Sequence, residues 1–240
     1  MRLEPLTFQS ETPIQIDWHA RLTASWFLVV VLGSVHLLTA PLAGAGFSAL
    51  VLERTALFRS QLGGQVDDLV AAGELWRLAS SVALHVDGLH LFVNLVALIG
   101  LGRLLEPWIG GFRLLGWFCA GGIFASACSH LSGIEASDGA SGGAFALLGA
   151  LVLLGWDAKL EFEPETAWML RSPVRWLAAL NLVLPLFLTF LDGVGHFAGF
   201  VVGMGLLVLA RRWPAAAALL DLCSIGVVAC SLSWALLQAV

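Results

Sequence analysis

Apolar residues in this chain gather into long runs that short polar connections separate. Seven of these runs approach the roughly 20 residues that a helix needs to cross the hydrocarbon core of a bilayer. They cover residues 25–43, 89–105, 112–131, 139–155, 174–191, 194–210 and 216–237. The pattern therefore predicts an all-α polytopic membrane protein.

One long segment, residues 44–87, interrupts this pattern because it mixes apolar side chains with charges and is too polar to span. Long loops in compact proteins are often functional, and mixed segments of this kind can lie in the membrane interface. We expect a partly helical interfacial insertion, with Trp76 and Arg77 as headgroup anchors near its end. The predicted organisation is a cytoplasmic segment 1–24, a transmembrane core 25–212 that contains the interfacial loop 44–87, and an additional helix within 213–240.

Composition agrees with a membrane protein, since 59% of residues are hydrophobic and only 12% are charged, against about 25% charged in soluble domains. The net charge of −5 comes without a basic patch, so we expect no nucleic-acid partner. Placing the N-terminus in the cytoplasm puts nine of the twelve Lys and Arg residues inside, as the positive-inside rule favours. High Ala, Leu and Gly with one Lys indicate a bacterial protein, and therefore an inner-membrane location.

Four polar residues on three predicted helices lie at one depth. Ser141 and His196 are each 15 residues from an inner-interface residue, Trp156 and Arg211 respectively, which is about 22 Å of helix. Counted from Glu106, His90 and Asn94 fall about 24 and 18 Å up the second helix. Their spacing of four residues puts both on one helix face. We therefore expect the residues Ser141, His196, His90 and Asn94 to meet in the outer part of the membrane.

Such a group has the components of acyl-transfer chemistry. Serine is a weak nucleophile until a base takes its proton, and histidine is the usual base. The developing oxyanion needs donors, and the Asn94 amide, a His90 ring N–H and the backbone N–H of Ser141 are candidates. No acid is evident that would orient His196, because Asp192 is expected at the surface. The residues favour a Ser–His dyad over a triad.

Glycines around both residues predict a close helix contact. Gly139, Gly142 and Gly143 flank Ser141, and Gly195, Gly199 and Gly203 repeat every four residues beside His196. Small residues let membrane helices approach closely. The repeat therefore predicts one smooth face that brings the imidazole against the hydroxyl.

Three motifs together resemble those of the rhomboid family of intramembrane serine proteases. They are Gly139-Ala140-Ser141-Gly142, the series His85, His90 and Asn94, and Gly195-His196-Phe197-Ala198-Gly199 followed by Gly203. The resemblance covers about residues 70–210, and the motifs occur in the family's order. It implies a rhomboid-like six-helix bundle, to which the last transmembrane helix is an addition.

The resemblance also implies a function and residue roles. Ser141 is the implied nucleophile, His196 the general base and acid, and His90 and Asn94 form the oxyanion hole. The implied supporting residues are Gly139, Gly142, Phe145 and Gly199. The reaction is hydrolysis of a peptide bond in or near a transmembrane segment of another membrane protein, in the lipid bilayer and without a cofactor or metal. Many members have Tyr at the position of Phe145, which keeps a ring that can stack on His196.

Two other classes stay open at this stage. A rhomboid-like protein could bind membrane clients without cutting them, and His85, His90 and His196 could instead hold a metal. His85 precedes its span, so we expect it to bond within the insertion. Asp221, an acid in an apolar run, is expected to form an interfacial ion pair with Arg211 or Arg212.

Overall fold

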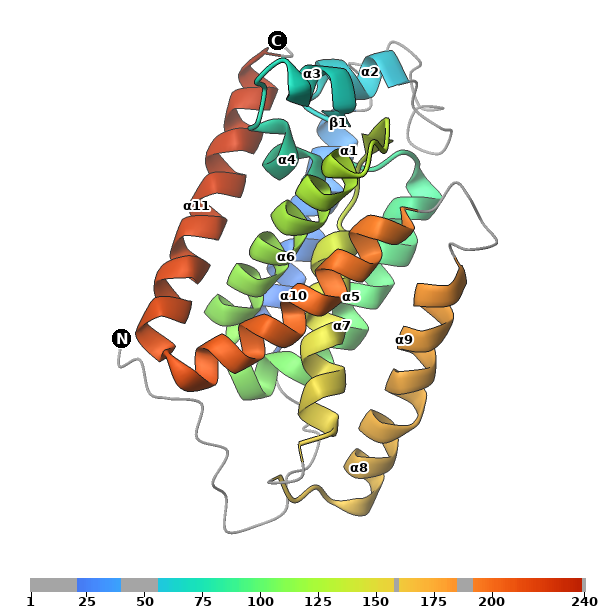
Figure 1. Ribbon diagram of the computed structural model, residues 1–240, viewed down its shortest axis with the longest axis vertical. Coiled ribbons are helices and arrows are strands. Elements are labelled where there is room, and N and C mark those ends of the chain that lie inside the picture. Colours follow the sequence, from blue (N-terminus) through green and yellow to red (C-terminus); the bar gives the residue numbers. More distant parts are fainter. Residues whose placement is uncertain (1–20, 40–55, 158–159, 185–191, 239–240) are drawn as a thin grey trace.

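Long apolar helices make up most of the structure (Figure 1), a computed structural model that describes residues 21–39, 56–157, 160–184 and 192–238. The long helices are α1 (Thr23–Thr39), α5 (Gly88–Ile109), α6 (Gly111–Leu131), α7 (Ser141–Gly155), α9 (Pro173–Val183), α10 (Gly193–Arg212) and α11 (Pro214–Gln238). Among the described residues, α5, α6, α10 and α11 are long and apolar enough to cross a membrane, while α1 and α7 are shorter apolar helices. The all-α polytopic membrane fold is thereby confirmed.

Helix α7 is the centre of the bundle. It is buried at every position except Ser141 and Leu153, and it packs chiefly against α10 and α6. A helix that is apolar all round is expected to be surrounded in this way. Its 15 residues span about 22 Å, less than the roughly 30 Å hydrocarbon core. One end of α7 therefore stops inside the thickness that its neighbours span.

The observed helix limits follow the expected spans with local differences. The predicted link 106–111 is instead helical as far as Ile109, with Pro107 inside the last turn of α5. Gly110, at a φ of +80°, ends α5 and leads directly into α6, because glycine adopts this backbone conformation without strain. The expected span 174–191 begins with α9, and its residues 185–191 lie outside the described residues, as do 40–43 of the first span.

The described part of the insertion is partly helical, as expected. It contains α2 (Ala56–Gln61), α3 (Asp67–Ala71), α4 (Arg77–Ser80) and the 3₁₀ helix η3 (Ser81–Ala83), with strand β1 (Gln65–Val66). Strand β1 pairs antiparallel with β2 (Ala136–Ser137), so that Gln65 faces Ser137. This two-strand ladder fastens the insertion to the loop that enters α7. A further short helix, α8 (Pro164–Arg171), occupies the charged connection before α9.

Two predicted contacts were wrong. Arg77 is not a headgroup anchor, because it is buried and its guanidinium donates to the carbonyls of Ser60 and Gly64 at 2.6 and 3.1 Å. Asp221 pairs with Arg113 of α6 at 3.9 Å rather than with Arg211 or Arg212. A Cβ at Gly116 would overlap the Asp221 side chain, so this carboxylate lies directly on α6 and holds α11 there. Arg211 pairs instead with Asp157.

Candidate active site

The loop before α7 sets the position of Ser141, the first residue of that helix. Gly139 has a φ of +142°, which only glycine adopts readily, and its N–H donates to the carbonyl of Ser81 at 3.0 Å. The next N–H, that of Ala140, donates to His85 Nε2 at 3.4 Å. His85 is therefore hydrogen-bonded to the serine loop. This corrects the expectation from the sequence that it would bond within the insertion.

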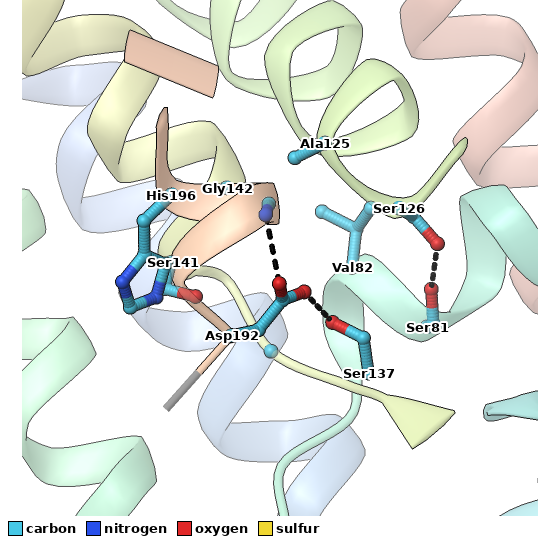
Figure 2. A pocket seen from close by; sticks show the side chains of 12 residues that line it. Ser81, Val82, Ala125, Ser126, Ser137, Ser141, Gly142, Asp192 and His196 are labelled. Carbon is cyan, nitrogen blue, oxygen red and sulfur yellow. Dashed lines mark hydrogen bonds between the residues drawn. The ribbon is translucent and has the colours of Figure 1, made fainter. Parts of the chain in front are cut away.

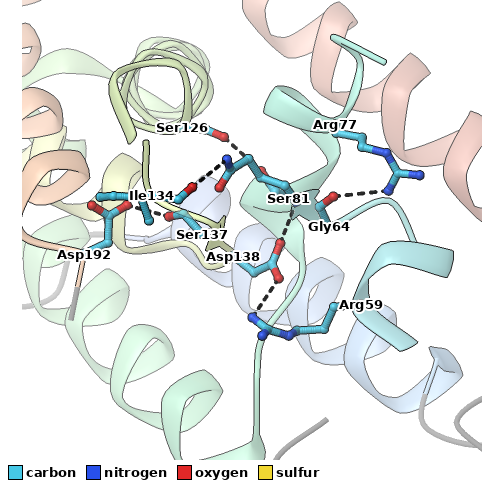
Figure 3. Close-up of polar contacts among 10 residues, drawn as sticks. Arg59, Gly64, Arg77, Ser81, Ser126, Ile134, Ser137, Asp138 and Asp192 are labelled. Carbon is cyan, nitrogen blue, oxygen red and sulfur yellow. Dashed lines mark hydrogen bonds and ion pairs between the residues drawn. The ribbon is translucent and has the colours of Figure 1, made fainter. Parts of the chain in front are cut away.

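Asp138 anchors the same loop from the other side (Figure 3). Its carboxylate accepts from the backbone N–H of Gln65 at 2.9 Å and pairs with Arg59 at 3.2 Å. Burial raises the pKa of Asp138 to about 6, even though Arg59 and the Gln65 N–H favour the charged form. The backbone entering Ser141 is thus tied to β1 and to α2.

Helices α7 and α10 touch through their backbones, as the glycine repeat predicts. A Cβ at Gly199 would overlap the carbonyl oxygen of Gly142, and a Cβ at Gly203 would overlap that of Ala146. Larger residues at these positions would push the helices apart. This contact brings the start of α10, which carries His196, against the start of α7, which carries Ser141.

Phe145 fixes the plane of the His196 ring. The two rings stack with centroids 4.3 Å apart and planes inclined by 15°, a geometry in which aromatic rings attract each other. Phe145 is one helical turn after Ser141, so the stack orients the imidazole beside the hydroxyl. Among the described residues, His196 Nδ1 is buried without a hydrogen-bond partner.

Ser141 and His196 line one small polar cavity between α7, α10 and η3 (Figure 2). The space that a water-sized molecule can occupy there is about 20 Å³, enough for a water molecule. Gly139 and Gly142 are also part of its wall. The remaining lining residues are Ser81, Val82, Gly122, Ala125, Ser126, Ser137, Asp192 and Gly195.

His90 and Asn94 lie behind the serine loop and outside this cavity wall. A Cβ at Gly139 would come within 2.7 Å of His90 Cε1, so the His90 ring rests against that glycine. Asn94 is buried and its amide nitrogen donates to the His90 carbonyl at 2.9 Å. One of the two amide hydrogens is thus used within α5, which leaves the second for a ligand.

Asp192 is a further residue whose position differs from the one expected from the sequence. It was expected at the surface, whereas it is half-buried and lines the cavity with Ser141 and His196. As the N-cap of α10 it accepts from the Gly195 N–H at 2.7 Å. The signal available in the sequence was Asp immediately before a glycine-rich helix, which is a typical N-cap pattern.

Comparison with known proteins agrees with this architecture. A family model described as "Rhomboid domain" matches residues 72–213. RHOMBOID-like protein 5 of Arabidopsis thaliana is 34% identical over 162 residues, which are 63% of this chain and 50% of that protein. Rhomboid protease GluP of Bacillus subtilis is 30% identical over 141 residues, 59% of this chain and 27% of that protein.

A fungal relative extends this range. Rhomboid-type serine protease 2 of Emericella nidulans is 30% identical over 157 residues, 63% of this chain and 30% of that protein. The chain thus spans half or less of the length of these relatives. They come from a plant, a bacterium and a fungus, so the resemblance does not support the expected bacterial inner membrane. Because the family model covers more than half of the chain, including Ser141 and His196, the protein belongs to the rhomboid family.

Proposed function

We propose that the protein is an intramembrane serine endopeptidase that hydrolyses peptide bonds in or near transmembrane segments of other membrane proteins. The observation that carries this proposal is the shared cavity of Ser141 and His196, in which Phe145 orients the imidazole. Ser141 Oγ attacks the scissile carbonyl, and His196 takes its proton and then gives it to the leaving amine. A water molecule hydrolyses the acyl-enzyme with His196 again as base. These steps are complete without a metal or cofactor.

The start of α7 supplies the oxyanion site in this proposal. The backbone N–H of Ser141 belongs to the first turn, where N–H groups lack helical partners and the helix dipole favours negative charge. His90 and the second amide hydrogen of Asn94 provide side-chain donors. Both act on a substrate carbonyl that enters beside Gly139, whose missing side chain lets the His90 ring lie directly against the serine loop.

The protein in proteoliposomes with a single-span model substrate tests this proposal. Ser141→Ala and His196→Ala should each lower the cleavage rate about 10⁴-fold or more, because the two groups act as a unit. A fluorophosphonate probe should label the parent and not Ser141→Ala. Ser233→Ala, an exposed serine of α11, is the matched control and should cleave and label like the parent. Cleavage by Ser141→Ala at the parent rate contradicts the proposal.

A non-catalytic client-binding protein is the second candidate. It would retain the transmembrane partner but fail both to cleave it and to label at Ser141. The third class, a His-ligated metal protein, finds no support among the described residues, where no three His, Cys, Asp or Glu side chains are grouped to hold a metal. Cleavage that a chelator abolishes, and that Ser141→Ala keeps, would favour that class instead.

We also propose an orientation with the N-terminus in the cytoplasm and the cavity opening toward the outer side. The Lys and Arg distribution supports it, since most basic residues then lie inside. Cysteine-accessibility labelling in sealed vesicles distinguishes the two orientations. A cysteine introduced at the exposed Leu75 should react with an impermeant reagent only from the outer side.

A further inference from the structure

Asp192 and His196 both lie at the N-terminus of α10. This is the end of the helix at which a protonated histidine is electrostatically least favoured. His196 is in the first turn of that helix, and its backbone N–H donates to the Asp192 carbonyl at 3.1 Å. The unpaired N–H groups of a helix N-terminus act as a partial positive charge, which opposes a cation nearby. A general base at this position therefore needs a compensating negative charge when it takes a proton.

The immediate neighbours of the imidazole in the described part of the chain show where this compensation comes from. Among the described residues, Nδ1 of His196 is buried without a hydrogen-bond partner. The titratable groups that act on His196 there are Asp192 on its own helix and His90 on α5. The neighbours from α7, Ser141 and Phe145, are uncharged, and on α6 the thiol of Cys128 lies within electrostatic reach of Asp192. Asp192 is thus the one negatively charged neighbour in that set.

Three hydrogen bonds hold the Asp192 carboxylate in the cavity wall. It accepts from the hydroxyl of Ser129 at the end of α6, from that of Ser137 in β2 at 2.5 Å (drawn in Figure 2), and from the Gly195 N–H. These donors come from three separate elements. Capping the helix requires only the hydrogen bond from Gly195. The two additional hydroxyl donors fix the position of the carboxylate more firmly than capping requires.

We propose that Asp192 is a positioning residue for the reaction, whose carboxylate stabilises the imidazolium of His196 while tying α10 to α6 and β2. This inference rests on the proposed Ser141–His196 chemistry. When the Ser141 hydroxyl proton moves to His196, the new positive charge forms in the first turn of α10, whose N-terminus the Asp192 carboxylate caps. Asp192 itself touches no reacting atom.

The rate of fluorophosphonate labelling of Ser141, measured from pH 4 to 9, tests the inference without a known substrate. Asp192→Asn keeps the shape and the capping oxygen, because Asn caps helices as well as Asp, and it removes the charge. The pH of half-maximal labelling should move about half a unit lower, and the plateau rate should fall about threefold, as expected for one charge near a helix terminus.

Ser233→Ala is the matched control, since it removes an exposed hydroxyl of α11 that donates to the Ala229 carbonyl and leaves Asp192 and its charge in place. Its pH of half-maximal labelling should coincide with that of the parent. A profile of Asp192→Asn that coincides with the parent, or an equal shift in both variants, overturns the inference and leaves only a structural cap. Should Asp192→Asn fail to fold, Asp192→Ser retains a capping hydroxyl and replaces it under the same criteria.

The outcomes also separate this inference from the proposed function. Absence of Ser141-dependent labelling in the parent refutes the proposed function. If the parent is labelled at Ser141 but the pH profile of Asp192→Asn is unshifted, only the proposed role of Asp192 is refuted.

Discussion

Replacing Gly139 by Ala perturbs the serine loop at a single carbon atom, and its effect can be worked out from the structure. At a φ of +142° a residue with a side chain is strained by about 1–3 kcal/mol. The new Cβ would lie 2.7 Å from Cε1 of His90, whereas carbon atoms at contact are about 3.5–4.0 Å apart. The His90 ring or the loop must therefore move by close to 1 Å.

A second contact couples the ring to the same loop. His85 packs edge-to-face against His90 with ring centroids 5.2 Å apart, and His85 also accepts from the Ala140 N–H of that loop. The displacement is thus transferred to the backbone next to Ser141. A misplacement of about 1 Å can cost 10²-fold in rate, so we expect labelling of Ser141 to slow between about tenfold and 10²-fold.

The assay compares fluorophosphonate labelling rates and thermal unfolding midpoints of purified Gly139→Ala and parent in one detergent. Gly73→Ala is the matched control, because Gly73 has a φ of +105° and nothing within 4 Å of its Cβ position. It should lose stability but label like the parent. A Gly139→Ala protein that labels as fast as Gly73→Ala would refute the reasoning, since the contact with His90 would then carry no cost in rate.

Three further perturbations give measurable outcomes. Phe145→Leu, which removes the ring stacked on His196, should slow labelling about fivefold while Phe145→Tyr does not, because an aromatic pair contributes about 0.5–1.5 kcal/mol. The pKa of Asp138 is raised to about 6 in the folded state, whereas a free Asp has a pKa of about 4. The protonated carboxyl therefore stabilises the folded protein fully below about pH 4, and this stabilisation is lost as pH rises through 6. The thermal midpoint should accordingly fall over this range in the parent relative to Asp138→Asn, and parallel curves would contradict this. Glu106→Gln replaces the carboxylate that accepts from the N–H groups of Ala24 and Ser25. It should cost about 1–3 kcal/mol of stability. The unfolding midpoint should fall, and the pH optimum of labelling should stay unchanged.

Much of the architecture follows from the sequence because membrane insertion is decided by local apolar length. A span must satisfy its own backbone groups as a helix, so the runs that give α5, α6, α10 and α11 predict their helices within a few residues. The site motifs were visible for a similar reason. Residues at one depth on neighbouring helices meet when glycines let the helices touch, and Gly199 and Gly142 do so here.

Other contacts depend on which surfaces face each other, and the sequence does not specify them. Asp221 finds Arg113 because α11 packs along α6, although Arg211 is nearer in the chain. His85 reaches Ala140, 55 residues away, because η3 brings the end of the insertion under the serine loop. Arg77 is buried because the insertion folds around it.

The sequence by itself determined a helical membrane protein with a serine and a histidine at one level, because helix length and residue spacing act along a single chain segment. Only the tertiary structure placed Asp192 in the cavity wall. Its position depends on hydroxyls from α6 and β2, more than 50 residues before it. Hydrogen bonds between distant segments have no local periodicity, so the electrostatic surroundings of His196 could be read only once the helices were packed.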